Sequence, residues 1–303
     1  MPPTACRTTT RASRPPLCGV STTGTGLPLR IVVYGADGVG KTSLAAHFQA
    51  PVFLYPSGDT GLETLLDTGR LPPVAHFGAI QDWQEVLDNL EQLLEASHDY
   101  QTVIVDGLGG LERLCHERVC QRDFGGDWGE LGFHGYQRGY EVAVAEWRKM
   151  LAALELLRIE RRMGVVLLSA SRVVPFRNPA GADFDRFSPD LHAKSWSVTQ
   201  RWADVVGFLN FVPSAGTPRR SRRIRAIAPW VRHLSLERSI AHDAKNRPGL
   251  PSEIPLPGDD DASAYLAWQR AVATLAGPRG RSAAKRKTGT KPQSCPIEQK
   301  VPA

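Results

Sequence analysis

The feature that most constrains this 303-residue sequence is one octapeptide with the spacing G-x-x-x-x-G-K-[ST]. It lies between a short β-branched run at residues 30–34 and a segment with helical patterning at residues 41–49. Glycines in such a turn let the backbone wrap closely around an anion, and the N–H groups at the start of the helix point toward it. The sequence therefore predicts a polyphosphate-binding loop. We expect it to be formed by Gly35, Ala36, Asp37, Gly38, Val39, Gly40, Lys41, Thr42 and Ser43.

Two side chains of this loop and one distant carboxylate suit nucleotide chemistry. We expect Lys41 to reach the β- and γ-phosphates of ATP, and the hydroxyl of Thr42 to ligate Mg²⁺. Asp106 directly follows the mostly apolar run at residues 102–105, which is the place of a second Mg²⁺ ligand at the carboxyl end of a buried strand. The alternative is that Asp106 only caps the helix that follows. ATP and Mg²⁺ are the expected cofactors, and Lys41 and Asp106 are expected to meet at the ends of neighbouring strands.

Alternating strands and helices predict the α/β fold class. Apolar residues recur with helical spacing at 83–94 and from 140 to about 162. Further strands are indicated by the apolar runs at residues 52–55, 102–105, 165–168 and 205–212. Because such runs are typical of strands buried on both faces, we expect a mainly parallel sheet flanked by helices, with ligands at the carboxyl ends of the strands.

The less regular segments are interpreted by their composition. Alternating residues predict edge strands at 223–227 and 231–236, and a helix is expected at 262–275. Residues 172–193 contain several turn formers and little periodicity, which favours a long surface loop.

The predicted organisation is one core with extensions at both ends. Residues 1–29 contain no acid, and residues 279–303 hold seven bases and one acid, compositions that favour disorder. No apolar run approaches the roughly 18 residues of a membrane span, and five cysteines make no disulfide framework, so we expect a cytoplasmic protein without membrane contact. The predicted units are a disordered extension (1–29), the α/β core (30–256), a C-terminal helix (257–278) and a disordered basic tail (279–303).

Charge is segregated along the chain. Residues 31–216 hold 16 Lys and Arg against 24 Asp and Glu, whereas residues 217–248, named here the basic strip, hold nine bases against two acids. Such a strip attracts a polyanion by releasing counterions, although a solvated loop is the plainer interpretation. We expect contacts to nucleic acid from Arg219, Arg220, Arg222, Arg223, Arg225 and Arg232, with Trp230 as a base-stacking residue.

An ordered set of motifs resembles the phage nucleotide-binding proteins of the RecA-like P-loop class, which include phage single-strand annealing ATPases. The set runs through residues 30–256 as IVVYGADGVGKTSLAAHF, TVIVDGLGGLE, GYQRGYEVAVAEW, VVLLSA, RWADVVGFL and AKNR followed by LPSEIPL. The resemblance implies a RecA-like core that binds ATP and Mg²⁺, self-association into a ring or filament on single-stranded DNA, and a role in recombination or annealing. It also implies that Lys245 and Arg247, which resemble a K-x-R element, enter the ATP site of a neighbouring subunit.

Two positions depart from the pattern of these relatives. Ser57 stands at about the position of their catalytic Glu, and a neutral hydroxyl is a poor general base. Asp59 or Glu63 is the candidate substitute, so ATP hydrolysis could be slow. Where relatives often place a His after the fourth strand, this chain has Ala170 and Ser171.

Three other functions remain open on the sequence. The loop and the D-x-x-G at residues 106–109 are similar to those of Ras-like GTPases, but no N-K-x-D follows before residue 171 to recognise guanine. A small-molecule kinase of the P-loop class is a second alternative. A nucleotide-binding interaction protein with little or no hydrolysis is a third, and Ser57 favours it.

Two further groups of residues are interpreted as packing. Cys115, His116, Cys120 and His134 lack the spacing of zinc ligands. Tyr136, Tyr140 and Trp147 recur at helical spacing, which favours a core position over base stacking.

Overall fold

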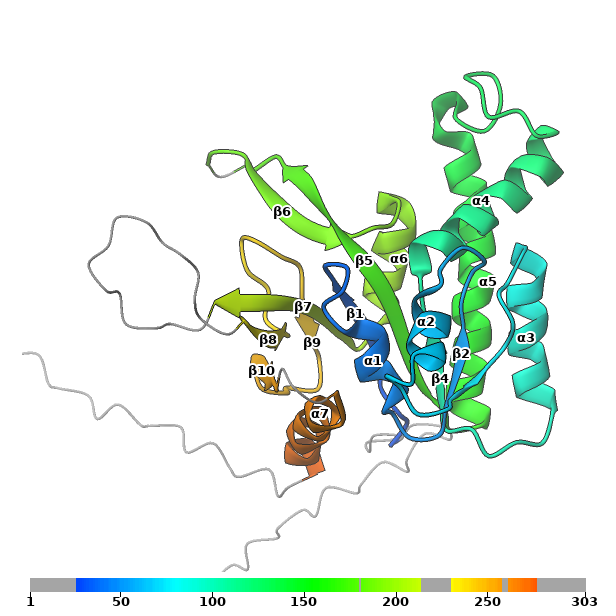
Figure 1. The fold of residues 1–303 in the computed structure, drawn as a ribbon. Helices are drawn as coiled ribbons and strands as arrows, with labels where there is room; N and C mark the ends of the chain where they lie inside the picture. The colour runs from blue at the N-terminus through cyan, green and yellow to red at the C-terminus, as the bar shows by residue number, and fades with distance from the viewer. Residues whose placement is uncertain (1–25, 180, 214–229, 258–260, 277–303) are drawn as a thin grey trace, which may run out of the picture.

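A mixed β-sheet forms the centre of the molecule (Figure 1). The computed structural model describes residues 26–179, 181–213, 230–257 and 261–276. Within these residues the strand order is β10-β8-β7-β1-β5-β4-β2-β3, with β6 paired to β5 and β9 paired to β7. The strands are β1 (Arg30–Gly35), β2 (Pro51–Leu54), β3 (Ala75–His76), β4 (Thr102–Val105), β5 (Gly164–Phe176), β6 (Phe184–Pro189), β7 (Val205–Pro213), β8 (Trp230–Ser235), β9 (Lys245–Asn246) and β10 (Glu253–Leu256).

The six strands from β7 to β3 in this order are parallel, which confirms the predicted α/β class. One expectation was wrong: β1 and β4 are not neighbours, because β5 pairs with both and lies between them. The carboxyl ends of all three strands still face the same edge of the sheet, so the phosphate-binding loop and Asp106 remain close.

Helices cover both faces of the sheet. The helices are α1 (Lys41–Ala46), α2 (Gly61–Asp67), α3 (Trp83–Glu95), α4 (Leu108–Phe124), α5 (Arg138–Glu160), α6 (Ala193–Trp202) and α7 (Asp261–Ala276), with one 3₁₀ turn at Gly135–Gln137. Successive strand residues point to opposite faces, so Val32 and Tyr34 pack with α3, α4, α5 and α6, while Ile31 and Val33 pack with α1, α2 and α7.

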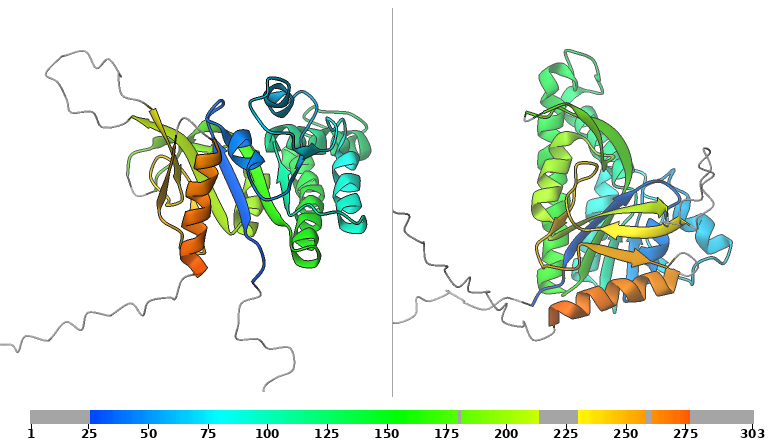
Figure 2. Two further views of the ribbon diagram at one scale, coloured as in Figure 1. Left: turned by 60° about the horizontal axis from the view of Figure 1, so that its bottom comes forward. Right: turned by 90° about the vertical axis from the view of Figure 1, so that its left-hand side faces the viewer.

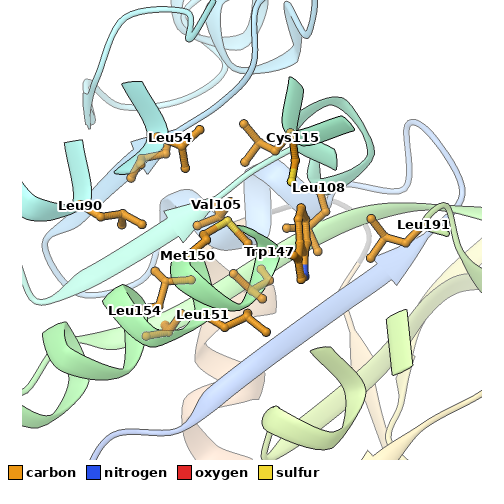
Figure 3. Packing of buried hydrophobic residues seen from close by; sticks show 14 of the residues in the cluster. Leu54, Leu90, Val105, Leu108, Cys115, Trp147, Met150, Leu151, Leu154 and Leu191 are labelled. Atoms are coloured by element: carbon orange, nitrogen blue, oxygen red, sulfur yellow. The ribbon is translucent and has the colours of Figure 1, made fainter. Parts of the chain in front are cut away.

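The larger hydrophobic core lies under α3, α4 and α5 (Figure 3). Trp147 on α5 is fully buried, stacks on Trp83 of α3, and donates its indole N–H to the Thr199 hydroxyl at 2.8 Å. Leu154 and Leu157 continue the same buried face of α5. The helical spacing that the sequence showed therefore marks the core, and Trp147 has no face left for a base.

The segment at residues 172–193 corrects a second expectation, because it is mostly a β-hairpin and not a surface loop. β5 continues past the sheet to Phe176, and β6 returns antiparallel to it, with Ser171 opposite Pro189 and Phe176 opposite Phe184 (Figure 1). Pro175 and the turn-forming residues at 178–181 obscured the alternation in the sequence. Helix α6 then begins within the same predicted loop, at Ala193.

The expected edge strand at 231–236 forms as β8, but it is internal, because β10 pairs along its outer side. The expected strand at 223–227 lies outside the described residues. So do residues 1–25 of the extension (1–29) and the whole of the basic tail (279–303), the two segments for which disorder was predicted. None of the helices in the described part of the chain is long and apolar enough to span a lipid bilayer.

The C-terminal helix belongs to the core. α7 lies along β10 and α1, as two views show (Figure 2). Ala264, Trp268 and Ala271 are buried in the same hydrophobic cluster as residues of α1, and the rings of Phe48 and Tyr265 lie 4.9 Å apart. The helix thus packs directly behind the segment that follows the phosphate-binding loop.

Candidate nucleotide-binding site

The predicted phosphate-binding loop joins β1 to α1. Gly38 and Gly40 have φ values of 74° and 91°, in the left-handed region that favours glycine. A side chain at Gly40 would also overlap the guanidinium of Arg232, which lies against the loop. Both glycines are therefore favoured by the left-handed backbone path of the loop.

Lys41, the first residue of α1, is held across the loop. Its Nζ donates to the carbonyl oxygens of Gly35 at 3.0 Å and Ala36 at 2.9 Å, and lies 3.8 Å from a carboxylate oxygen of Asp37. Burial lowers the pKa of Lys41, and the carboxylates of Asp37, Asp106 and Asp59 oppose that shift. The ammonium group is thus held in the cavity, where it could donate hydrogen bonds to phosphate oxygens.

Thr42 on α1 and Asp106 after β4 converge although β5 lies between β1 and β4. The Thr42 hydroxyl donates to Asp106 Oδ2 at 2.7 Å. Asp106 is 7% exposed, and burial raises its pKa to about 6, against the opposing effect of the Thr42 hydrogen bond. A hydroxyl beside a carboxylate is a donor set that suits Mg²⁺, which prefers oxygen ligands. The pair therefore fits the predicted metal role.

A cavity of about 410 Å³ joins these groups. Its lining comprises Asp37, Gly38, Lys41, Thr42, Asp59, Gly61, Asp106, Gly107, Gly109, Gly110, Ser169, Ala170 and Asp190. Asp59 also lines a neighbouring groove of about 550 Å³, formed mainly by residues 56–61 with Gly110 and Arg113. The Asp59 carboxylate, which accepts the backbone N–H of Gly61 at 3.2 Å, thus lies where the cavity meets the groove.

The two other candidates for a general base lie outside this cavity. Ser57 lines only the neighbouring groove, and its backbone N–H donates to Ile80. The Glu63 carboxylate accepts the Tyr55 hydroxyl at 2.8 Å, and burial together with this hydrogen bond raises the pKa of Tyr55 to about 12. Of the three candidates, Asp59 alone lines the same cavity as Lys41 and Asp106.

The sequence did not reveal two polar residues of the cavity wall. Ser169 is buried at the end of the parallel part of β5, and Asp190 follows β6 and donates its backbone N–H to Ala170. Asp190 reaches the cavity only because the hairpin returns to the sheet edge. A strand signal in residues 184–189 was the clue that could have placed it.

Comparison with known proteins identifies the family of this chain. A protein family described as an AAA domain matches residues 27–248. The chain belongs to this AAA domain family. Solved structures that match include the crystal structure of the RadB recombinase, at 16% sequence identity and a TM-score of 0.40, covering 70% of this chain and 82% of that one. The curated proteins searched gave no match.

In this AAA domain protein the K-x-R residues lie at the opposite edge of the sheet from the phosphate-binding loop. Lys245 Nζ donates to the carbonyls of Gln200 at 2.6 Å, Arg201 at 3.1 Å and Ala203 at 2.6 Å, at the end of α6. Arg247 Nη1 lies 3.4 Å from Asp204, and its side chain is 51% exposed. Lys245 therefore caps a helix within its own chain, and Arg247 is the more accessible of the two.

Lys245→Ala should lower the free energy of unfolding by about 1–2 kcal/mol, because three carbonyls at a helix C-terminus lose a cationic donor. Arg247→Ala should change it by less, about 0.5 kcal/mol, because the Arg247 side chain is half exposed and Asp204 keeps its ion pair with Arg30. Urea unfolding of both variants measures the difference. Equal effects of the two substitutions would contradict the capping role of Lys245.

The basic strip is only partly described. Arg219, Arg220, Arg222, Arg223 and Arg225 lie outside the described residues, and of Trp230 only the backbone, in β8, is described. Arg232 corrects an expectation: it is 6% exposed, so it cannot present its guanidinium to a nucleic acid on the surface. Its charge is paired with Asp261 instead, at 2.6 Å.

The tyrosines and cysteines between α4 and α5 differ in exposure. Tyr136 is 99% exposed, so it is not a core residue, in contrast to the expectation from spacing. Tyr140 stacks on His192 with ring centroids 4.0 Å apart. Cys115 and Cys120 are buried in α4, and burial raises the pKa of both thiols.

Proposed function

We propose that this protein is an ATPase that acts on single-stranded DNA in recombination or annealing of the phage type. The family and fold give it a nucleotide-binding P-loop domain, a kind of domain that usually uses Mg²⁺. The observation that carries the proposal is the convergence of Lys41, Thr42 and Asp106 on one cavity behind the glycine loop.

Different residues of the cavity would bind the phosphates and the Mg²⁺ ion. Backbone N–H groups of the loop and the Lys41 ammonium would bind the phosphates of ATP, and Thr42 with Asp106 would hold Mg²⁺. Bound there, Mg²⁺ neutralises charge on the β- and γ-phosphate oxygens. Burial of the site strengthens these electrostatic contacts by excluding water.

Asp59 is the proposed general base in place of the missing Glu. Its carboxylate lies at the junction of the cavity and the neighbouring groove, where a water molecule can approach the terminal phosphate. The groove also gives an adjacent subunit access to the same phosphate, which is where we propose that Arg247 acts.

The DNA proposal depends on the charge of the chain. In the sequence the basic strip comes after β7, and the β5–β6 hairpin, which carries the exposed Arg172 and Arg177, extends from the same edge of the sheet as the end of β7. Contacts made mainly to phosphates predict binding that depends little on sequence.

Titration of labelled single-stranded DNA at two salt concentrations, with and without ATP, tests this partner. If about six phosphates are contacted, affinity should fall by roughly 10³-fold between 50 and 200 mM salt. ATP should change the affinity or the size of the complex. A chain that binds ATP but shows no DNA binding at low salt would overturn the recombination proposal and leave the nucleotide site intact.

A nucleotide-binding interaction protein with little hydrolysis is the second candidate, because Ser57 lies outside the cavity that holds Lys41 and Asp106. Single-turnover measurement of ATP cleavage in the presence of DNA separates the two. A GTPase is disfavoured, since no N-K-x-D lies between Asp106 and Ser171.

A further inference from the structure

A buried arginine adjoins the nucleotide site without lining its cavity. Arg232 lies in β8, between β7 and β10, and its side chain is 8% exposed. Its Nη1 donates to Asp261 Oδ1 at 2.6 Å and its Nη2 to the Pro257 carbonyl at 2.8 Å. Both acceptors belong to the chain around the start of α7, so this guanidinium ties the C-terminal helix to the sheet.

The same guanidinium also lies against the phosphate-binding loop. A Cβ placed on Gly40 would overlap Arg232 Nη1 and lie 3.8 Å from Asp261 Oδ1. Gly40 is the residue directly before Lys41, and its carbonyl accepts the first helical hydrogen bond of α1, from Leu44. The ion pair therefore supports the loop at the point where its N–H groups pass into the helix.

Stability alone does not account for a charged pair at this place. Burying two charges costs desolvation energy that their attraction only partly repays, and apolar replacements of similar volume are often neutral. Arg232 Nε is, moreover, buried without a hydrogen-bond partner among the described residues. Burying the Arg232 cation beside a phosphate-binding loop costs desolvation energy. We therefore expect the cation to contribute to binding of the phosphate anion.

Helix α7 also packs against α1, the helix that follows the phosphate-binding loop. Phe48, just beyond α1, contacts Tyr265 and Trp268 of α7, with ring centroids 4.9 and 6.2 Å apart. Leu44 of α1 is buried in the same cluster as Ala264. Helix α1 thus packs on α7 through apolar side chains, and the loop before α1 lies next to the ion pair that joins α7 to β8.

We propose that Arg232 is a positioning residue of the nucleotide site. Held by Asp261, it fixes Gly40 and the N–H groups around it, so that docking of α7 and binding of a nucleoside triphosphate are coupled. This inference rests on the proposed nucleotide binding and adds to it a link between the C-terminal helix and the phosphates.

Equilibrium binding of a fluorescent ATP analogue with Mg²⁺ to the full chain tests the role. Arg232→Met should weaken binding about 10-fold, which is within the usual range of coupling between sites, and Arg232→Lys should recover part of the loss because it keeps the charge. Asp261→Asn, which keeps the shape of the side chain, should weaken binding about 5-fold. The matched control is Arg30→Met, which breaks a largely buried ion pair with Asp204 at the other end of β1.

Amide hydrogen exchange separates coupling from a purely structural role, because a structural role would not make the protection of α7 depend on ATP. Saturating ATP should slow exchange in the first two turns of α7 in the wild-type chain, and this protection should be lost in Asp261→Asn. Arg232 variants that bind ATP like the wild type, or affinity losses equal to that of Arg30→Met, would overturn the coupling alone. Failure of the wild-type chain to bind the analogue would overturn the proposed function as well.

Discussion

Replacing Lys41 with alanine is expected to weaken ATP binding by about 100-fold or more. The ammonium group is buried, with a side-chain exposure of 11%, and it donates to two carbonyls of the loop at 3.0 and 2.9 Å. Phosphate oxygens would replace these neutral acceptors, and hydrogen bonds between charged groups contribute roughly 1.5–3 kcal/mol each. Isothermal titration of the variant with ATP and Mg²⁺ measures the loss.

The control for this substitution is Lys149→Ala on α5. Lys149 pairs with Glu146 at 2.9 Å but is 59% exposed and far from the loop, so its loss should leave ATP affinity within twofold of the wild type. A Lys41→Ala chain that remains folded and binds ATP within threefold of the wild type would contradict the assignment of the loop.

Asp106→Asn should have two opposite effects, a loss of Mg²⁺-dependent ATP turnover of about 100-fold or more and a gain in stability. The carboxylate is 7% exposed, and its pKa is raised to about 6, so the folded chain pays for keeping it ionised at pH 8. An amide of the same shape can still accept the Thr42 hydroxyl. It carries no charge to desolvate, and it is a poor ligand for Mg²⁺.

The stability gain should depend on pH in a defined direction. Because the folded-state pKa of Asp106, about 6, lies above the ordinary value of 3.8, the folded chain binds this proton more tightly than the unfolded chain does. The wild type therefore loses stability as the pH rises from about 4 to about 6, by up to about 3 kcal/mol, and the variant does not. Urea unfolding without Mg²⁺ or nucleotide should show a larger advantage of the variant at pH 8 than at pH 5. An Asp106→Asn chain less stable than the wild type at pH 8 would contradict this account.

The parts of the site that are local in sequence could be predicted from it. The loop is specified by glycines and Lys41 within one octapeptide, and Asp106 is marked by the apolar strand before it. The long-range parts could not be predicted in the same way. Nothing in residues 102–106 indicates that β5 inserts beside β4, because strand order depends on packing between segments far apart in the chain.

The burial of Arg232 also depends on long-range contacts that the sequence does not show. In the sequence it is one of a run of arginines, and its charge favoured a place on a nucleic-acid surface. Its burial follows from the pairing of β10 along β8 and from the position of Asp261, 29 residues further on. Charge composition thus indicated which region of the chain is a candidate for contact with nucleic acid. It did not indicate that Arg232 in this region is buried in an ion pair.

Calorimetric titration of the wild-type chain with ATP in magnesium buffer tests the nucleotide site most directly. We expect one nucleotide to bind per chain, with an affinity that falls when EDTA removes Mg²⁺. We also expect no binding of adenosine at the same concentrations, because the contacts are to phosphates. Absence of any binding at millimolar ATP by the folded protein would contradict the nucleotide site.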